Sequence, residues 1–84
     1  MGNSITALRA KRKAQGVSLM DLARRARLDY TTVQPIDAGK VAGGLTTRFK
    51  ISAALGDKSF RLWPEDARAE LREFRRSMSF DETK

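Results

Sequence analysis

The side chains in this sequence that could do chemistry are mostly cations. Seventeen lysines and arginines stand against ten aspartates and glutamates in 84 residues, so the formal net charge is +7. Residues 1–58 contain eleven basic and four acidic side chains, whereas residues 59–84 contain six of each. An excess of this size on so small a body indicates a polyanionic partner, and it places the binding surface in the first two-thirds of the chain.

Covalent and acid–base chemistry has little support. The sequence contains neither cysteine nor histidine, which excludes disulfides, thiolate metal sites, cysteine nucleophiles and imidazole bases. Other reactive residue types are present but are not grouped as nucleophile, base and orienting partner. Asp21, Asp29 and Asp37 are better explained as helix caps and ion-pair partners. We therefore expect a protein that is not an enzyme and that needs neither a cofactor nor a metal.

Length and composition favour one small globular domain. The chain is 40% hydrophobic and 32% charged, and it contains no apolar run of 18 residues that could cross a membrane. Residues 1–10 lack the apolar stretch of a secretory signal. We expect a cytoplasmic protein that does not contact a membrane.

Capping residues and glycines predict the first two helices. Asn3 or Ser4 can cap a helix that ends at Gly16. Ser18, with Asp21 three residues later, resembles a capping box and opens a second short helix.

The same signals predict a third and a fourth helix. Asp29 can cap a helix that ends at Gly39, and Thr46 or Thr47 can start another that ends at Gly56. The apolar residues expected inside the four helices are Ile5, Leu8, Leu22, Ala23, Ala26, Val33, Ile36, Phe49, Ile51 and Leu55.

A fifth helix is predicted to begin at Pro64, which suits a first helical turn. Its apolar residues Ala67, Leu71, Phe74 and Met78 form one narrow stripe on a charged helix. The stripe can pack on the domain core, or Leu71, Phe74 and Met78 can form a contact with a second copy of the chain. We predict an all-α, five-helix bundle in a single domain, with a binding core at 1–58, a C-terminal helix at 59–78 and a frayed tail at 79–84.

The second and third predicted helices are separated by only a few residues in a basic domain, as in a DNA-binding helix-turn-helix. Further positions agree at consistent spacing: Leu8-Arg9-x-x-Arg12, Gly16-Val17-Ser18-x-x-x-Leu22-Ala23-x-x-Ala26-x-Leu28, Thr32-Val33-x-x-Ile36-Asp37-x-Gly39-Lys40 and Lys50-Ile51-x-x-Ala54-Leu55-Gly56. This pattern resembles the Cro/XRE-type helix-turn-helix family, which includes small phage repressors and the controller proteins of restriction–modification systems. The resemblance covers roughly residues 5–56 and implies the lambda-repressor-like form of the five-helix fold.

The resemblance implies that the segment Tyr30–Ala38 enters the major groove of double-stranded DNA. Tyr30 and Thr31 would face base edges, with Gln34 one turn later on the same side. Glutamine can pair with adenine through two hydrogen bonds, and threonine can contact a thymine methyl. Pro35 also occupies a base-facing position, where it offers at most an apolar contact.

The resemblance also implies a set of phosphate contacts. Ser18 would present a hydroxyl and free backbone N–H groups at the start of the second helix. Thr32 could touch a phosphate or cap its helix, and Lys40 and Arg48 are either phosphate contacts or ordinary exposed cations. Arg12 would contact a phosphate as well.

One ion pair and several departures follow from the family pattern. Arg12 should lie within salt-bridge reach of Asp37 while still showing donors to a phosphate. Leu19 replaces a glutamine that usually reaches a phosphate, and Arg48 stands where an apolar residue is common. Pro35 should kink or shorten its helix, because proline lacks the N–H of an interior position.

The implied function is that of a sequence-specific transcriptional regulator, a repressor that binds an inverted-repeat operator as a homodimer. Its own concentration, proteolysis or a protein antagonist would relieve binding. Two alternatives stay open. One is a protein-interaction module of the antitoxin or anti-activator type, which Leu19 and Pro35 support. The other is an excision factor of a phage or mobile element that bends DNA.

Overall fold

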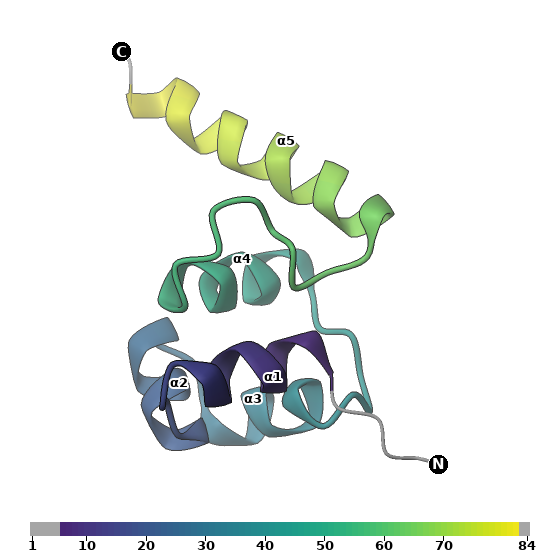
Figure 1. The fold of residues 1–84 in the computed structure, drawn as a ribbon. Helices are drawn as coiled ribbons and strands as arrows, with labels where there is room; N and C mark the ends of the chain where they lie inside the picture. The colour runs from purple at the N-terminus through teal and green to yellow at the C-terminus, as the bar shows by residue number, and fades with distance from the viewer. Residues whose placement is uncertain (1–5, 83–84) are drawn as a thin grey trace.

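The computed structural model describes the backbone of residues 6–82 and the side chains of residues 6–77. This part of the chain forms five α-helices and no strands, which confirms the all-helical prediction (Figure 1). The helices are α1 (Ala7–Ala14), α2 (Leu19–Ala26), α3 (Tyr30–Asp37), α4 (Leu45–Ala54) and α5 (Glu65–Glu82). α1, α2 and α3 lie together, α4 covers them, and α5 lies over α4 (Figure 1). None of these helices is both long and apolar enough to cross a membrane.

One hydrophobic core joins all five helices. Leu8, Leu22, Val33, Ile51 and Leu71 come one from each helix, and each is at most 2% exposed. The expected inward-facing residues between 8 and 55 are buried or pack against this core, whereas Ile5 lies outside the described residues. Burial of these side chains supplies the main drive for folding.

α1 begins later than the capping signals predict. The expected caps Asn3 and Ser4 lie outside the described residues, and Thr6 is the N-cap instead, its Oγ1 accepting the Arg9 N–H at 3.0 Å. The same hydroxyl donates to the Asp37 carbonyl oxygen at 2.9 Å. Thr6 therefore caps its own helix and also ties the start of α1 to the end of α3.

The start of α2 is confirmed and the start of α4 is corrected. Ser18 caps α2, and the backbone N–H three residues later donates to its Oγ at 3.0 Å. α4 begins after Gly44, which has no side chain to cap with, rather than at Thr46 or Thr47. The earlier start adds Leu45 to the helix, where it packs against the core.

The predicted glycines follow three of the helix ends. Gly16, Gly39 and Gly56 have φ angles of 69°, 81° and 72°, the left-handed region in which glycine carries no side-chain penalty. α2 ends differently, at Arg27, whose φ is 59°.

α5 begins directly after Pro64, whose carbonyl oxygen accepts the Arg68 N–H at 3.0 Å. The helix continues to Glu82, four residues beyond the predicted end of the C-terminal helix at residue 78. Residues 65–84 contain no glycine or proline that would end the helix earlier.

The first turns of α5 pack on the core of their own chain. Ala67 and Leu71 are buried, and the Phe74 ring meets the Phe49 ring edge-on at a centroid distance of 5.2 Å. Leu71 is 0% exposed, so of the two alternatives for this residue the structure shows packing on the core of its own chain. The Met78 side chain lies outside the described residues.

A buried polar cluster fixes the connection between α4 and α5. Trp63 Nε1 donates to Ser52 Oγ at 2.7 Å, and Ser52 Oγ donates to an Asp57 carboxylate oxygen at 3.3 Å. The Asp57 carboxylate also accepts the backbone N–H groups of Arg61 and Leu62, both at 3.0 Å. Every member therefore has a partner, as a stable buried cluster requires.

Candidate nucleic-acid interface

α2 and α3 pack against each other and are joined by the three residues 27–29. Arg27 turns the chain in the left-handed conformation, and the Leu28 N–H donates to the Ala23 carbonyl oxygen at 2.9 Å. Asp29 occupies the predicted N-cap position of α3, but its side chain makes no capping bond. Its backbone carbonyl accepts the N–H of Val33 instead, at 3.2 Å.

The two faces of α3 differ sharply in burial. Val33 and Ile36 are 0% and 5% exposed, which confirms that they belong to the core. Tyr30, Thr31 and Gln34 are exposed, with Tyr30 at 40%, and Thr32 is exposed beside them. The residues predicted to face bases at the start of the helix therefore share a free surface of hydrogen-bonding side chains.

Pro35 lies inside α3, beyond its first turn, and the helix runs through it to Asp37. Proline has no N–H, so the Thr31 carbonyl oxygen loses the bond that residue 35 would normally donate. Pro35 is half-buried, and its own carbonyl oxygen accepts the Lys40 N–H at 2.9 Å. The helix ends two residues later, just before the predicted stop at Gly39, and Pro35 offers less surface to a ligand than Gln34 does.

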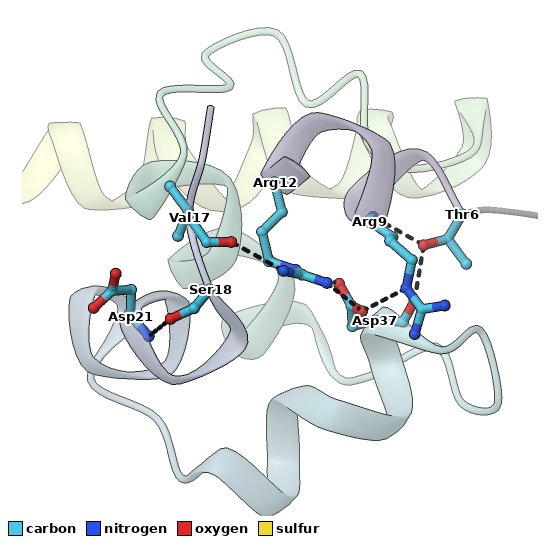
Figure 2. A network of polar contacts seen from close by, with 7 residues as sticks. All are labelled: Thr6, Arg9, Arg12, Val17, Ser18, Asp21 and Asp37. Atoms are coloured by element: carbon cyan, nitrogen blue, oxygen red, sulfur yellow. Dashed lines mark hydrogen bonds and ion pairs between the residues drawn. The ribbon is translucent and has the colours of Figure 1, made fainter. Parts of the chain in front are cut away.

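Asp37 is the centre of a polar network between α1 and α3 (Figure 2). Its Oδ1 accepts Arg12 Nε at 2.9 Å, and its Oδ2 accepts Arg12 Nη2 at 3.1 Å and Arg9 Nε at 2.9 Å. The Asp37 side chain is 0% exposed and that of Arg12 is 10% exposed. The predicted ion pair of Arg12 and Asp37 is thus confirmed, with the two-pronged geometry that arginine makes with a carboxylate.

Arg12 has little exposed surface for the phosphate contact that the resemblance implies. Its third guanidinium nitrogen, Nη1, donates to the Val17 carbonyl oxygen at 2.9 Å, so every nitrogen of the group serves the fold. Arg9 is the cation of this network that reaches the surface, with 36% of its side chain exposed. The sequence contained a signal for it, because Arg9 lies one helical turn before Arg12 and so shares its face of α1.

The network changes the acidity of its central group. Burial raises the pKa of the Asp37 carboxyl, but the hydrogen bonds and charges of Arg12 and Arg9 outweigh burial and hold the pKa below its usual value of 3.8. Asp37 therefore stays ionised at neutral pH, and the helix that carries the base-facing side chains is tied to α1 by charge as well as by packing.

The remaining predicted phosphate contacts occupy different environments. Ser18 and Lys40 are exposed, although Ser18 Oγ already accepts a backbone N–H. Arg48 is half-buried: its Nε donates to the Ala42 carbonyl oxygen at 3.0 Å and its guanidinium lies 5.7 Å from the centre of the Trp63 ring. Arg48 thus braces the loop that follows α3 and is not an ordinary exposed cation.

Exposed cations lie on both sides of α3 in the sequence. Arg24, Arg25 and Arg27 are exposed at the end of α2, and Lys40 is exposed after α3. Of the four acidic residues within 1–58, two are buried, namely Asp37 and Asp57. The surface of this part of the chain is therefore more basic than its composition indicates.

The arrangement can present hydrogen-bonding side chains to a ligand while cations on the flanking segments bind an anionic backbone. Comparison of the chain with protein-family models, with curated proteins and with solved structures finds no match.

Proposed function

We propose that this chain is a sequence-specific DNA-binding regulator of the lambda-repressor-like helix-turn-helix type, with α3 as its recognition helix. The observation that carries the proposal is the outer face of α3, where Tyr30, Thr31 and Gln34 are exposed although Val33 and Ile36 hold the inner face in the core. α2 packs across α3 after a three-residue connection, as the first helix of such a motif does. Gln34 is the side chain best suited to discriminate a base, because its amide can bond adenine twice.

The positions of the exposed cations support contacts with the phosphates of the DNA backbone. Arg24, Arg25, Arg27 and Lys40 are exposed next to α3 in the sequence, and Arg9 is half-exposed beside Asp37. Phosphate contacts of this kind position a protein on the duplex, whereas base contacts provide the sequence preference. Because Asp37 holds α3 against α1, the base contacts of α3 and the phosphate contacts of the flanking segments can form on one duplex at the same time.

The regulator acts as a homodimeric repressor in this proposal. Each copy binds one half of an inverted repeat, and two-fold symmetry on B-DNA sets the half-sites about 34 Å apart. Occupancy of the operator excludes the transcription machinery. The regulator's own concentration, proteolysis or a protein antagonist controls occupancy.

One observation favours a protein-interaction module as a second candidate. Met20 is 57% exposed in the first turn of α2, beside Leu19, at the place where a phosphate contact is expected. An exposed methionine there suits a protein partner better than a phosphate.

Selection of bound duplexes from a random library tests the proposal. We expect the chain to enrich one inverted-repeat sequence, and its affinity for that duplex to fall steeply with salt as counterions are released. Lys40→Gln should lower the slope of log affinity against log salt by about one contact. Lys58→Gln is the matched control, because Lys58 is an exposed lysine beside α5, where Arg75 Nη1 donates to its carbonyl oxygen at 2.8 Å. If the selection enriches no sequence and the affinities of both variants depend equally on salt, DNA recognition is contradicted and the protein-interaction module is favoured.

A further inference from the structure

The outer side of α4 carries an apolar strip, formed by Phe49, Ala53 and Ala54, between two open hollows. Phe49 and Ala53 line both hollows, of which one extends to α5 and the other to the end of α2. Ala53 is exposed and Phe49 is half-buried, so the strip offers apolar surface to a ligand. None of the residues proposed to contact bases lines either hollow.

The size of the hollows favours a macromolecular ligand. They measure about 270 and 260 Å³, each below the range of about 300–1,000 Å³ that is usual for small-molecule pockets. Because the two hollows share Phe49 and Ala53, one ligand can occupy both across the strip. A segment of a protein that places a few apolar side chains side by side has this form.

Cations border the strip on both sides. Arg25, Arg27 and Lys50 line the hollow beside α2, and Lys58 and Arg75 line the hollow beside α5. None of these five side chains forms an ion pair with another described side chain. The strip is therefore surrounded by positive charge that the described part of the chain does not neutralise.

Arg75 differs in this respect from the other arginines of α5. The three others each lie 3.0 to 3.9 Å from a glutamate of the same helix, namely Arg68, Arg72 and Arg76. Arg75 Nη1 instead donates to the Lys58 carbonyl oxygen at 2.8 Å, and its guanidinium lies 4.8 Å from the centre of the Phe60 ring. These contacts hold Arg75 at the edge of the hollow and leave its charge without a carboxylate.

Among the described residues that line the two hollows, one is acidic, and it is buried. Asp57 is 6% exposed, and its carboxylate accepts the backbone N–H groups of Arg61 and Leu62. It therefore presents little negative charge to an incoming ligand. A complementary ligand carries carboxylates around its apolar side chains.

The apolar centre distinguishes this surface from one that binds nucleic acid. Phosphate contacts come from cations, hydroxyls and N–H groups, and the side chains of Phe49, Ala53 and Ala54 offer none of these. An aromatic residue at the centre with charged groups around it is the usual arrangement of a protein–protein interface. The observations favour an acidic protein over DNA or RNA.

We propose that the strip is the docking surface for an acidic, amphipathic segment of a different protein. Apolar side chains of that segment occupy the two hollows, and its carboxylates pair with Lys50, Lys58 and Arg75. Arg25 and Arg27 flank α3 as well, so a bound segment takes up two cations available to DNA and lowers DNA affinity. That consequence rests on the proposed function, whereas docking does not and is measured without DNA.

Selection of short random peptides displayed on phage, at physiological ionic strength, tests the docking. We expect the enriched peptides to combine acidic with large apolar residues. Fluorescence anisotropy of labelled synthetic copies gives their dissociation constants. Ala53→Glu places a carboxylate in the middle of the strip and should raise these constants at least about tenfold. Residue 53 is exposed and glutamate is a good helix former, so circular dichroism should show an unchanged helix content.

Two control variants separate the strip from net charge. Ala10→Glu makes the same change at an exposed alanine of α1 that lines neither hollow, and it should leave the dissociation constants within about twofold. Lys58→Glu, at the edge of the strip, should weaken binding at least about threefold, whereas Lys13→Glu on α1 should again stay within about twofold.

Several results would overturn the proposal. The selection could enrich no peptide, or its peptides could bind Ala53→Glu and Ala10→Glu equally, which would mean that they do not use the strip. A wild-type dimer in sedimentation velocity that only Ala53→Glu dissociates would assign the strip to a second copy. Loss of duplex affinity in Ala53→Glu without loss of peptide affinity would assign it to nucleic acid. If instead the peptides behave as expected and no duplex is selected, docking stands and the proposed function fails.

Discussion

Arg12 and Asp37, 25 residues apart in sequence, meet through two hydrogen bonds of 2.9 and 3.1 Å inside the protein. The contact joins the last turn of α1 to the last residue of α3. Arg9 adds a second cation at 2.9 Å, and Thr6 binds the Asp37 backbone carbonyl at 2.9 Å. The end of the proposed recognition helix is thus held by three side chains of one N-terminal segment.

Removal of the Asp37 charge should be strongly destabilising. Asp37→Asn leaves the Arg12 guanidinium buried without its counter-charge, and we expect a loss of about 3–5 kcal/mol in the free energy of unfolding. Urea denaturation followed by circular dichroism measures it. Asp29→Asn makes the same change at an exposed residue without a capping bond, and should cost no more than about 0.5 kcal/mol. If Asp37→Asn and Asp29→Asn lower the free energy of unfolding by the same amount, the buried ion pair contributes nothing to stability.

Acid should weaken the fold through the same carboxylate. Because the pKa of Asp37 is lowered in the folded chain by Arg12 and Arg9, its contribution is complete above the ordinary value of 3.8 and is lost as the pH falls through the lowered value. The free energy of unfolding, measured from about pH 6 to about pH 2, should fall more for wild type than for Asp37→Asn. Parallel pH profiles would contradict the lowered pKa.

Local signals in the sequence predicted much of this arrangement. Ser18 as the cap of α2 and Gly39 after α3 follow from residue types at fixed spacing, and both are present. The ion pair of Arg12 with Asp37 was expected from the resemblance to a helix-turn-helix family, and it is present too. The inner face of α3 was equally predictable, because Val33 and Ile36 are apolar at helical spacing.

The features that the sequence left open depend on contacts between distant segments. Thr6 caps α1 while also bonding the Asp37 carbonyl, and no local rule contains that second bond. Arg12 makes a third bond, to Val17, that removes it from the surface. Leu71 belongs to an amphipathic stripe whose pattern is the same whether its own core or a second chain covers it.

Two glycines in the same backbone conformation should respond differently to alanine. Gly16 and Gly39 have φ angles of 69° and 81°, so each alanine carries a left-handed strain of about 1–2 kcal/mol. At Gly39 the new Cβ would also lie 2.9 Å from Thr6 Cγ2, whereas at Gly16 it would meet no atom within 4 Å. We expect Gly39→Ala to cost about 1 kcal/mol more than Gly16→Ala in urea denaturation.

The cause of that difference can be isolated. Thr6→Ser removes Cγ2 and keeps the hydroxyl that bonds Arg9 and Asp37. Gly39→Ala combined with Thr6→Ser should therefore lose the extra cost relative to Thr6→Ser alone. If the extra cost persists, the clash with Thr6 is not its source.

The Thr6 hydroxyl should itself contribute measurably. Thr6→Ala removes the cap of α1 and the bond to α3 together, and we expect a loss of about 1–2 kcal/mol in the free energy of unfolding. Thr46→Ala, at an exposed position of α4, is the matched control and should change stability by less than about 0.5 kcal/mol. An equal response of the two threonines would contradict the double role of Thr6.

Base discrimination by Gln34 tests the role of α3 most directly. Affinities of wild type and Gln34→Ala are measured by fluorescence anisotropy on the selected duplex and on a panel of its single-base-pair variants, at one salt concentration. We predict that wild type loses about 1–3 kcal/mol of binding free energy at one adenine–thymine pair when that pair is changed, and that Gln34→Ala binds all variants of the pair alike. Discrimination by Gln34→Ala equal to that of wild type at every pair would contradict the placement of α3 in the major groove.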